Sequence, residues 1–468
     1  MLLFDISAFG VKALSLIGSL SILVVLHEFG HYWAARRFNI RVNKFYLFFD
    51  FLFPMQNVAK FSLFKKKIGD TEYGIGWFPF GGYVDIAGMV DETKDEKAVE
   101  AENCPEDQQF RFKKPWQRLI VMIGGVVMNL LLAMVLYFFL LWVWGEEYLP
   151  MKNITNGISV ESKIASDMGL QTGDKILQVD GKPSPSIERF VPDIILNNAK
   201  TITVDRNGQT LTLNIPEDFA QKVTQNGKAE VLIAPRFPTI IEDVISGSNA
   251  QKAGLEKGDK LVSVNGIPTE YFDQFKTNLD ANKGKTIKLM VERNNQPVWI
   301  DAKVGDDGKL GFQADSDVSK YFKTERKEYG FFQAIPAGIK KTFETLRNYF
   351  KSLGLLFKPK GPKLKDSVGG FYSMGKIFPS EFTWEGFWSL TALLSVVLAF
   401  MNILPIPMLD GGYVLFLLYE IVRGKPLPIK VQNFLQTIGF IIILGMIISV
   451  NALDIPRMWN DIKSAIGK

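Results

Sequence analysis

Four long apolar runs are the feature that most constrains how this chain can fold. They cover residues 9–35, 119–144, 388–404 and 434–450 of the 468-residue sequence. A helix needs about 20 apolar residues, with a range of about 17–25, to cross a bilayer. Lipid offers no partners to backbone polar groups, so only helices and closed barrels can span it. The sequence therefore predicts a polytopic α-helical membrane protein with four transmembrane helices. Its mean hydropathy of only +0.08 leaves room for water-soluble parts between them.

Basic residues flank these runs unevenly. The loop between the first two runs and the loop between the last two carry Arg36, Arg37, Arg41, Lys113, Lys114, Arg118, Arg423, Lys425 and Lys430. By the positive-inside rule both loops are cytoplasmic, so the termini and residues 145–387 are expected on the outer side. We interpret the first run as a retained helix, because no basic region precedes it and no convincing cleavage site follows. The net charge of +5 is modest, and the basic residues cluster beside the apolar runs. This indicates a lipid bilayer as partner and no nucleic acid.

The first run carries the clearest chemical signal. The chain has two histidines, His27 and His31, and Glu28 lies between them. Residues four apart share one face of a helix, so both imidazoles can reach one ion. Glu28 can accept a proton from a water held there, and this is the H-E-x-x-H arrangement of zinc peptidases. Ionisable residues inside a membrane helix are costly and typical of a functional site. The alternative is a buried helix in which the histidines make ordinary hydrogen bonds.

A second constellation ends the third run. The segment from Asn402 to Gly412 reads N-I-L-P-I-P-M-L-D-G-G, and its prolines, Pro405 and Pro407, break a helix. A catalytic zinc takes three protein ligands and keeps one position open. With no third histidine, the third ligand must be a carboxylate or a sulfur. Asp410 lies at the predicted depth of the histidines and is our candidate. The alternative is that Asp410 caps the helix that follows.

The first cytoplasmic loop, residues 39–116, contains a patterned stretch. Residues 73–87 read as two short strands around a Pro/Gly turn. Because this stretch is unusually apolar, we expect a membrane-associated β-hairpin near the metal. An ordinary surface hairpin is the alternative.

The outer segment contains an internal repeat. Residues 165–183 and 250–268 share the pattern A-x-x-x-G-L-x-x-G-D-K, with matching positions 85 apart. This predicts two related modules in tandem, at residues 150–235 and 236–315. The pattern resembles PDZ domains of bacterial envelope proteases, which bind extended peptides at a sheet edge. Spacers without a ligand are the alternative. The single cysteine, Cys104, excludes an internal disulfide.

Residues 320–386 follow the repeats. Between Tyr329 and Phe357, aromatic and apolar residues alternate with basic ones. This pattern is typical of an amphipathic helix at a membrane surface, here the outer one. A plain solvent-facing helix is the alternative.

Taken together, these motifs resemble the site-2 protease family and its bacterial enzymes of regulated intramembrane proteolysis. The resemblance covers nearly the whole chain, with residues 1–38, 117–145, 387–412 and 413–468 holding the four spans, the last with a cytoplasmic loop and C-terminal tail. It implies one Zn²⁺ per chain bound by His27, His31 and Asp410, with Glu28 as general base. It also implies that Asn402 contacts the substrate or the oxyanion. Substrate contacts are expected at Gly81, Gly82, Tyr83, Asn129, Pro405 and Pro407. The chain departs from its relatives at Val126, where a proline is frequent, and at Tyr413, where histidine is usual.

The resemblance further implies which proteins are cut and where. Expected substrates are single-span membrane proteins already trimmed by an upstream site-1 protease, such as anti-sigma factors in envelope stress signalling, and remnant signal peptides. The expected location is the bacterial inner membrane, with the active site in its cytoplasmic half. Two other classes compete. One is a multi-span prenyl-protein endopeptidase, which would use a Glu as third ligand and lack the repeats. The other is a scaffold with a structural metal, although such sites are normally closed by four ligands.

Overall fold

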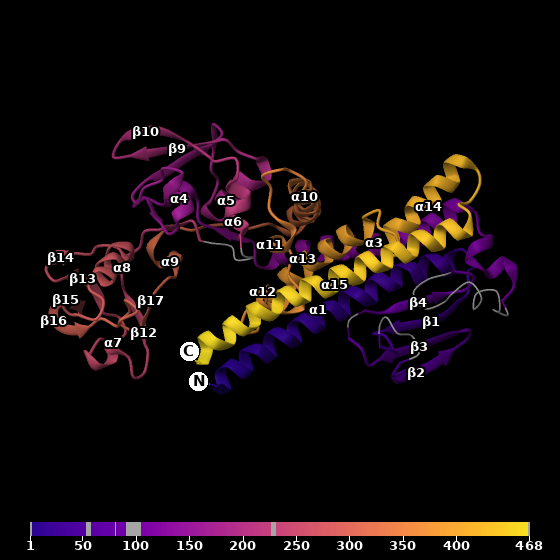
Figure 1. Cartoon of the computed structure of the whole chain (residues 1–468), viewed down its shortest axis with the longest axis horizontal. Coiled ribbons are helices and arrows are strands. Elements are labelled where there is room, and N and C mark those ends of the chain that lie inside the picture. The colour runs from indigo at the N-terminus through magenta and orange to yellow at the C-terminus, as the bar shows by residue number, and fades with distance from the viewer. Residues whose placement is uncertain (1, 53–57, 80, 90–103, 226–230, 467–468) are drawn as a thin grey trace. The chain divides into compact units, whose positions relative to one another are not determined.

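The chain forms two compact units, shown in Figure 1. The computed structural model describes residues 2–52, 58–79, 81–89, 104–225 and 231–466. One unit, which we call the membrane unit, comprises Met1–Gly145, Glu328–Gly354 and Leu364–Lys468. The other, which we call the repeat unit, comprises Glu146–Lys327 and Leu355–Lys363. We describe each unit by itself.

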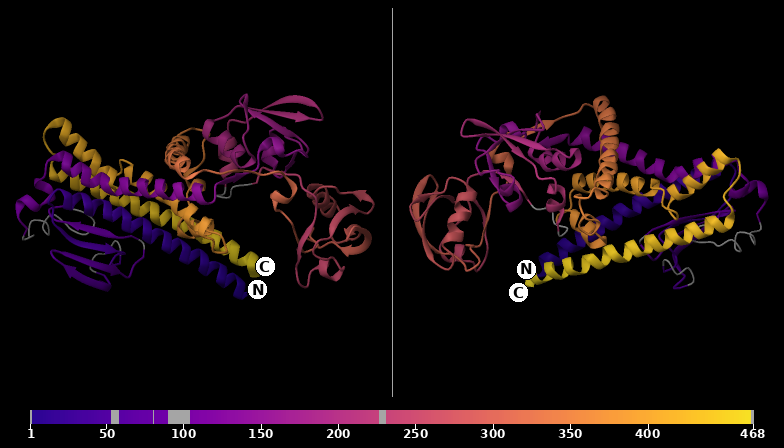
Figure 2. Two further views of the ribbon diagram at one scale, coloured as in Figure 1. Left: turned by 180° about the vertical axis from the view of Figure 1, so that it is seen from behind. Right: turned by 45° about the horizontal axis from the view of Figure 1, so that its top comes forward.

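The membrane unit contains the four expected apolar helices. Within the described residues, four helices are long and apolar enough to cross a membrane, with the stretches Phe9–Arg37, Pro115–Val143, Trp384–Ile403 and Ile429–Trp459. They belong to α1 (Leu2–Arg37), α3 (Pro115–Val143), α13 (Trp384–Ile403) and α15 (Ile429–Ile466). The four-helix prediction is confirmed, and the helices extend beyond the apolar runs because polar turns continue them. Figures 1 and 2 show the ends of α1 and α15 close together in this unit.

Helix α3 packs against both α1 and α13. Where α1 and α3 cross, a Cβ atom on Gly30 would lie 2.2 Å from the carbonyl oxygen of Gly124. Small residues at such a crossing allow helix backbones to approach closely. On the other side, the Ser395 hydroxyl of α13 donates to the backbone oxygen of Asn129 in α3 at 2.7 Å. These contacts fix three helices around the two histidines.

The aromatic segment after the repeats is helical, as expected. Helix α10 (Phe331–Leu356) packs Leu346 and Tyr349 against residues of α3 and α13, and two short helices follow, α11 (Leu364–Ser367) and α12 (Phe371–Ile377). Phe332 at its start is 81% exposed. Its helical state is confirmed, and its place at a membrane surface stays a prediction.

The connection expected at the start of residues 413–468 contains a helix. Helix α14 (Asp410–Arg423) begins directly after the proline-rich turn, and only a short connection separates it from α15. It forms because apolar residues recur at helical spacing and Leu417 packs in one cluster with Val121 and Met122 of α3. An ion pair between Arg118 and Glu420 joins the same two helices.

The predicted hairpin at residues 73–87 is wrong in its pairing. Four strands, β1 (Val42–Leu47), β2 (Ser62–Ile68), β3 (Thr71–Gly76) and β4 (Tyr83–Ile86), form one sheet in the order β2-β3-β1-β4. The two expected strands, β3 and β4, both exist, but β1 lies between them. It runs parallel to β3 and antiparallel to β4, and Tyr46 of β1 stacks on Tyr83 of β4. In Figure 2 this sheet lies beside the C-terminal part of α1.

The repeat unit contains the same topology twice. The first copy runs β6 (Ile158–Val160), α4 (Lys163–Asp167), β7 (Lys175–Val179), β8 (Lys182–Pro183), α5 (Ile187–Asn197), β9 (Thr201–Arg206), β10 (Gln209–Asn214), α6 (Phe219–Thr224) and β11 (Ile233–Pro235). The second runs β12 (Ile241–Val244), α7 (Asn249–Lys252), β13 (Lys260–Val264), β14 (Ile267–Pro268), α8 (Phe272–Ala281), β15 (Thr286–Arg293), β16 (Gln296–Lys303) and β17 (Phe312–Ala314). In each copy the first and last strands pair, and the other four form a sheet, β10-β9-β7-β8 or β14-β13-β15-β16. We call the copies module 1 and module 2.

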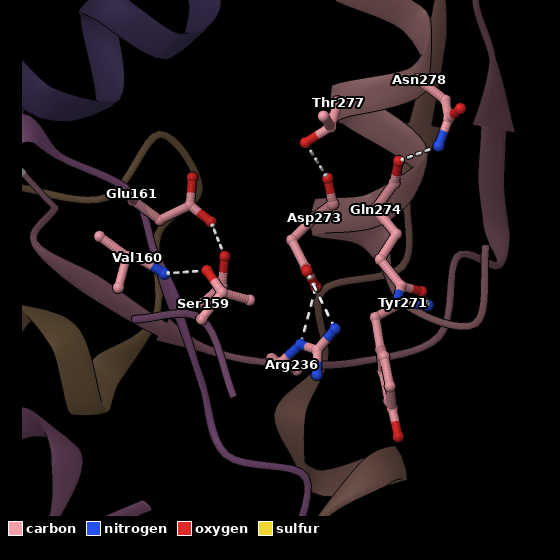
Figure 3. A network of polar contacts seen from close by, with 10 residues as sticks. Ser159, Val160, Glu161, Arg236, Tyr271, Asp273, Gln274, Thr277 and Asn278 are labelled. Carbon is pink, nitrogen blue, oxygen red and sulfur yellow. Dashed lines mark hydrogen bonds and ion pairs between the residues drawn. The ribbon is translucent and has the colours of Figure 1, made fainter. Parts of the chain in front are cut away.

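Short elements complete the repeat unit. Strands β5 (Glu146–Tyr148) and β18 (Glu325–Lys327) pair, and α9 (Val318–Tyr321) precedes β18. Figure 3 shows polar contacts at the start of module 2, where the guanidinium of Arg236 donates to the carboxylate of Asp273 in α8 and lies over the ring of Tyr271. An ion pair and a cation–π contact therefore connect the segment between β11 and β12 to the start of α8.

Candidate metal centre

The two histidines of α1 lie side by side and buried, with 8% and 7% of their surfaces exposed. The Nε2 atoms of His27 and His31 are 3.3 Å apart. Their rings are nearly perpendicular, at 82°. Both Nε2 atoms therefore point at one place on this face of α1.

Asp410 reaches the same place from a distant part of the chain. Its Oδ2 atom lies 3.3 Å from the Nε2 atom of each histidine. Asp410 is the first residue of α14, whose N-cap is Leu409 and has no side-chain cap, so the alternative in which Asp410 caps the helix is not found. Among the described residues, Asp410 Oδ2 is buried and has no hydrogen-bond partner.

These three atoms fit a zinc ion. The separations between the two nitrogens and the carboxylate oxygen are all 3.3 Å. Ligands at about 2.0–2.1 Å from a tetrahedral zinc are about 3.3–3.4 Å apart, so the triangle matches three corners of such a site. A buried carboxylate oxygen without a donor is costly unless a cation faces it. The donor set of two imidazoles and one carboxylate is that of catalytic zinc sites, which leave the fourth position open.

The turn before Asp410 is shaped by close backbone contacts. A Cβ atom on Gly411 would lie 2.2 Å from the carbonyl oxygen of Leu404, so this position requires glycine. Met408 adopts a φ of 88°, in the left-handed region that side chains other than Gly, Asn and Asp rarely occupy. Pro405, which is exposed, and Pro407 lie in this turn and outside the triangle. The turn therefore orients Asp410 at a cost in backbone strain.

Helix α3 supplies a partner to each imidazole from one stripe of its surface. The Nδ1 atom of His31 lies 2.9 Å from the carbonyl oxygen of Val121. The Nδ1 atom of His27 lies 3.1 Å from the side-chain amide of Asn129, which is fully buried. Between them, a Cβ atom on Gly125 would lie 2.4 Å from His31 Nε2, so only glycine leaves room for the rings. The sequence predictions missed Val121 and Gly125 as part of the site. Their spacing of four, which matches that of the histidines, is the signal that could have indicated them.

The predicted catalytic residues lie next to the triangle. Glu28 is half-buried, and the backbone of Val84 in β4 lies close to its carboxylate. The amide nitrogen of Asn402 lies 3.3 Å from His27 Nε2. The structure therefore brings the carboxylate and the amide together with the three ligand candidates. Their catalytic roles stay predictions at this point.

Gly81, Gly82 and Tyr83 connect the sheet to α1. A Cβ atom on Gly82 would lie 2.7 Å from Val24 and 3.6 Å from Glu28, so the backbone here runs against the catalytic helix. Tyr83 is buried and donates its hydroxyl to Asp50 at 3.0 Å. Burial raises the pKa of Tyr83 far above its usual range, so it remains a neutral donor. These residues position β4 beside Glu28, and their contact with substrate stays a prediction.

With this geometry in view, comparison with known proteins is decisive. The sequence profile of peptidase family M50 matches residues 15–446. The chain belongs to peptidase family M50. Among its relatives, the regulator of sigma-E protease RseP of Escherichia coli is 30% identical over 453 residues, covering 92% of this chain and 95% of the relative. The protease RseP of Yersinia pestis is 30% identical and covers 91% and 94%. A putative zinc metalloprotease of Vibrio cholerae is 28% identical and covers 94% and 97%.

Membership of family M50 confirms several predictions. The chain is a site-2 protease and a zinc metalloprotease, embedded in a membrane through apolar helices. The scaffold and prenyl-protein alternatives are therefore set aside. Zinc is the cofactor of this M50 protein, and the triangle of His27, His31 and Asp410 is the group of potential metal ligands in its described part.

Proposed function

We propose that this M50 protein is an intramembrane endopeptidase that holds one zinc ion per chain and cuts transmembrane segments of single-span proteins. One observation carries the proposal: a buried triangle of two imidazole nitrogens and a carboxylate oxygen, 3.3 Å on each side, with its histidines inside an apolar helix. A peptidase site at this depth acts on peptide bonds that lie within the membrane, because soluble substrates do not reach it.

The chain's own residues perform the proton transfers. His27, His31 and Asp410 hold the zinc ion, which when bound supplies an activated water at neutral pH and polarises the scissile carbonyl. Glu28 takes the proton from the attacking water and passes it to the leaving amine. Strand β4, whose Val84 lies close to Glu28, packs beside this carboxylate. Asn402, whose amide nitrogen is 3.3 Å from His27 Nε2, donates to the developing oxyanion.

A substrate helix must unwind before it is cut, because its carbonyls are engaged in the helix. Strand β4 ends the order of its sheet, and Val84 within it lies close to Glu28. An extended substrate added along this edge passes the catalytic carboxylate. Gly81 and Gly82 keep the edge free of side chains, Tyr83 anchors it through Asp50, and Pro405 and Pro407 shape the opposite side of the path.

Substrates and partners follow from the relatives. Several are called regulators of sigma-E protease, which supports a role in a sigma-E type pathway with anti-sigma factors as substrates. Pre-trimming by an upstream site-1 protease, cleavage of remnant signal peptides and placement in a bacterial inner membrane belong to the same proposal. The termini and the modules lie on the outer side, and the metal lies in the cytoplasmic half, as the distribution of basic residues favours.

The two modules, residues 150–235 and 236–315, are PDZ domains in this proposal, supported by their common topology and by the repeated G-D sequence. They act as a gate that excludes substrates with bulky outer domains, which gives a reason for the prior cut. Peptide binding at their sheet edges is the way PDZ domains recognise partners.

The test uses the full chain in proteoliposomes with one single-span substrate in long and trimmed forms. The wild type should cut the trimmed form within its membrane segment. Glu28→Gln should keep zinc and lose cleavage, because an amide preserves shape and cannot accept the proton. Glu385→Gln, the same change at an exposed position, is the matched control and should cleave normally. Retained cleavage in Glu28→Gln, or cleavage only outside the membrane segment, would contradict the proposal.

A further inference from the structure

The side-chain amide of Asn129 poses a conflict with zinc binding as its atoms are arranged. A neutral imidazole carries one N–H and one unprotonated nitrogen. If Asn129 Nδ2 donates to His27 Nδ1 across 3.1 Å, the ring hydrogen must be on Nε2. That is the nitrogen that lies 3.3 Å from both His31 Nε2 and Asp410 Oδ2. A protonated Nε2 has no lone pair for a metal, so one of the two interactions has to give way.

A half-turn of the amide removes the conflict. Rotation about the Cβ–Cγ bond exchanges Oδ1 and Nδ2 without moving other atoms of the side chain. Among the described residues, Asn129 Oδ1 is buried and has no hydrogen-bond partner. Turning it towards His27 therefore breaks no hydrogen bond of this oxygen and gives it a donor. The amide nitrogen gives up its contact with His27 in exchange, so the orientation is decided by which ring nitrogen of His27 carries the hydrogen.

The surroundings support the same arrangement. His31 already has its Nδ1 atom 2.9 Å from the carbonyl oxygen of Val121, an acceptor that requires Nδ1–H and leaves Nε2 free. Asn129 lies on the same stripe of α3, eight residues further, and faces His27 as Val121 faces His31. Its helix is fixed at that point, because Ser395 donates to the Asn129 backbone oxygen. Metal-binding histidines generally donate their second N–H to an acceptor that sets the ring and the tautomer.

We propose that Asn129 is a positioning residue whose Oδ1 atom accepts a hydrogen bond from His27 Nδ1–H and so keeps His27 Nε2 unprotonated for zinc. This inference rests on the proposed ligation by His27. It gives Asn129 a role in metal affinity in place of the contact with substrate expected from the sequence. Val121 and Asn129 then act as a matched pair, one backbone oxygen and one side-chain oxygen, that set both imidazoles for the same ion.

The test compares three variants of the full chain in detergent by competition for zinc with a chelator. Asn129→Leu keeps the volume and removes the acceptor, so zinc affinity should fall by about 10- to 100-fold, the usual effect of losing such a partner. Asn129→Asp keeps an oxygen acceptor and should bind zinc within about threefold of the wild type. Thr391→Val removes another fully buried polar group, in α13, and should bind as the wild type does. If Asn129 only filled space, Leu would be tolerated and the buried charge of Asp would be the worse change.

A second measurement needs no variant. The chain has two histidines, so ¹⁵N-histidine labelling followed by solid-state NMR in lipid resolves their ring nitrogens individually. In the zinc form, His27 should show a hydrogen on Nδ1 and a metal-shifted Nε2, as His31 should. A zinc form with unprotonated Nδ1 at His27, or unchanged zinc affinity in Asn129→Leu, overturns the role of Asn129. If neither histidine shifts on zinc addition, the proposed ligand set itself is wrong, which is a separate outcome.

Discussion

The repeat unit and the membrane unit place different residues in left-handed backbone conformations. Among the described residues of the repeat unit, the non-glycine residues with positive φ are Asp180, Asn198, Asn207, Asn265, Asn294 and Asn295. Among those of the membrane unit they are Asn39, Phe48, Ala59 and Met408. Gly, Asn and Asp tolerate this conformation, whereas for the other residues it costs about 1–2 kcal/mol. Turns in the repeat unit are thus made by residues that favour them, whereas the membrane unit also places Phe48, Ala59 and Met408 in this costly conformation.

The polar contacts of the two units differ in the same way. Each module has an Arg–Asp pair with the same geometry: Arg206 donates to Asp174 at 2.7 Å, and Arg293 donates to Asp259 at 2.7 Å. The candidate metal site instead brings together α1 and α14, which are distant in the sequence, with three potential ligand atoms 3.3 Å apart. The modules are stabilised by contacts that each copy makes for itself, and the site depends on long-range packing and on zinc.

The largest effect is expected for Asp410→Ala. It removes a ligand atom from the triangle, so zinc affinity should fall by more than about 100-fold, beyond the loss typical of a supporting partner. Zinc content and chelator competition measure this on the full chain. Asp259→Ala in module 2 is the matched control and should leave zinc affinity unchanged. Full zinc occupancy in Asp410→Ala would mean that another carboxylate is the ligand.

Arg293→Leu should destabilise module 2 by about 2 kcal/mol, because Asp259 is fully buried and loses a paired donor. The guanidinium is 23% exposed, so solvent screening keeps the loss below that of a fully buried pair. Hydrogen exchange should accelerate in β13, β15 and β16, with module 1 and zinc affinity unaffected. Arg206→Leu should accelerate hydrogen exchange in the equivalent strands of module 1 and leave module 2 unaffected. A fall in zinc affinity in either variant would show that the units are not independent.

The same contrast explains which parts could be predicted from the sequence. The presence of two related modules could be predicted, because the repeated sequence at residues 165–183 and 250–268 forms the same turns and strands in both copies. The four membrane helices could be predicted, because the length and apolarity of a segment determine whether it can span a bilayer as a helix. The strand order of the sheet β2-β3-β1-β4 could not be predicted. The position of β1 between β3 and β4 depends on tertiary contacts such as the stacking of Tyr46 on Tyr83. Helix α14 was foreseen only in the alternative in which Asp410 caps a following helix, because its packing against α3 carries no sequence signal.

For the candidate site, rarity and chemistry led to the prediction of His27, His31, Glu28 and Asp410, and the structure groups the first two with Asp410 as potential metal ligands. The sequence could not identify the atoms of α3 that contact the two imidazole rings. A carbonyl such as that of Val121 carries no sequence signal, because every residue has one. The requirement for glycine at position 125 arises only when α1 and α3 are packed together. Asn129 was singled out by resemblance, but its contact with His27 depends on the register of the two helices.

A smaller effect separates backbone strain from side-chain packing at Met408. At an ordinary position glycine is less stable than alanine by about 0.5–1 kcal/mol. With φ at 88° the order should reverse, so Met408→Gly should be more stable than Met408→Ala by about 1 kcal/mol. Thermal unfolding of the zinc-free chain measures the difference. The control position is Leu404, which lies in the same turn with a φ of −61°. There the Leu404→Ala variant should be at least as stable as Leu404→Gly. If Ala is also preferred at position 408, strain does not limit this turn.

The smallest effect concerns equivalent positions of the two modules. Asp180 Oδ1 accepts from the backbone N–H groups of Lys200 and Thr201 at 2.8 Å, and Asn265 Oδ1 accepts from that of Lys288 at 2.8 Å. These donors hold the pKa of Asp180 below its usual range. A carboxyl with a lowered folded-state pKa stabilises the fold above its unfolded pKa, about 3.9, and this contribution is lost as the pH falls through the folded value.

Module 1 should therefore lose protection from hydrogen exchange between pH 5 and pH 3 at β7 and β9, after correction for intrinsic rates. Module 2, with an amide at this position, should not lose it at β13 and β15. The exchange of residues sharpens the test: Asp180→Asn should abolish the pH dependence in module 1, and Asn265→Asp should introduce it in module 2. Asp180 is exposed, so solvent screens the interaction and the change should be small but opposite in the two variants. Equal behaviour of both modules in all forms would mean that other carboxylates govern their acid stability.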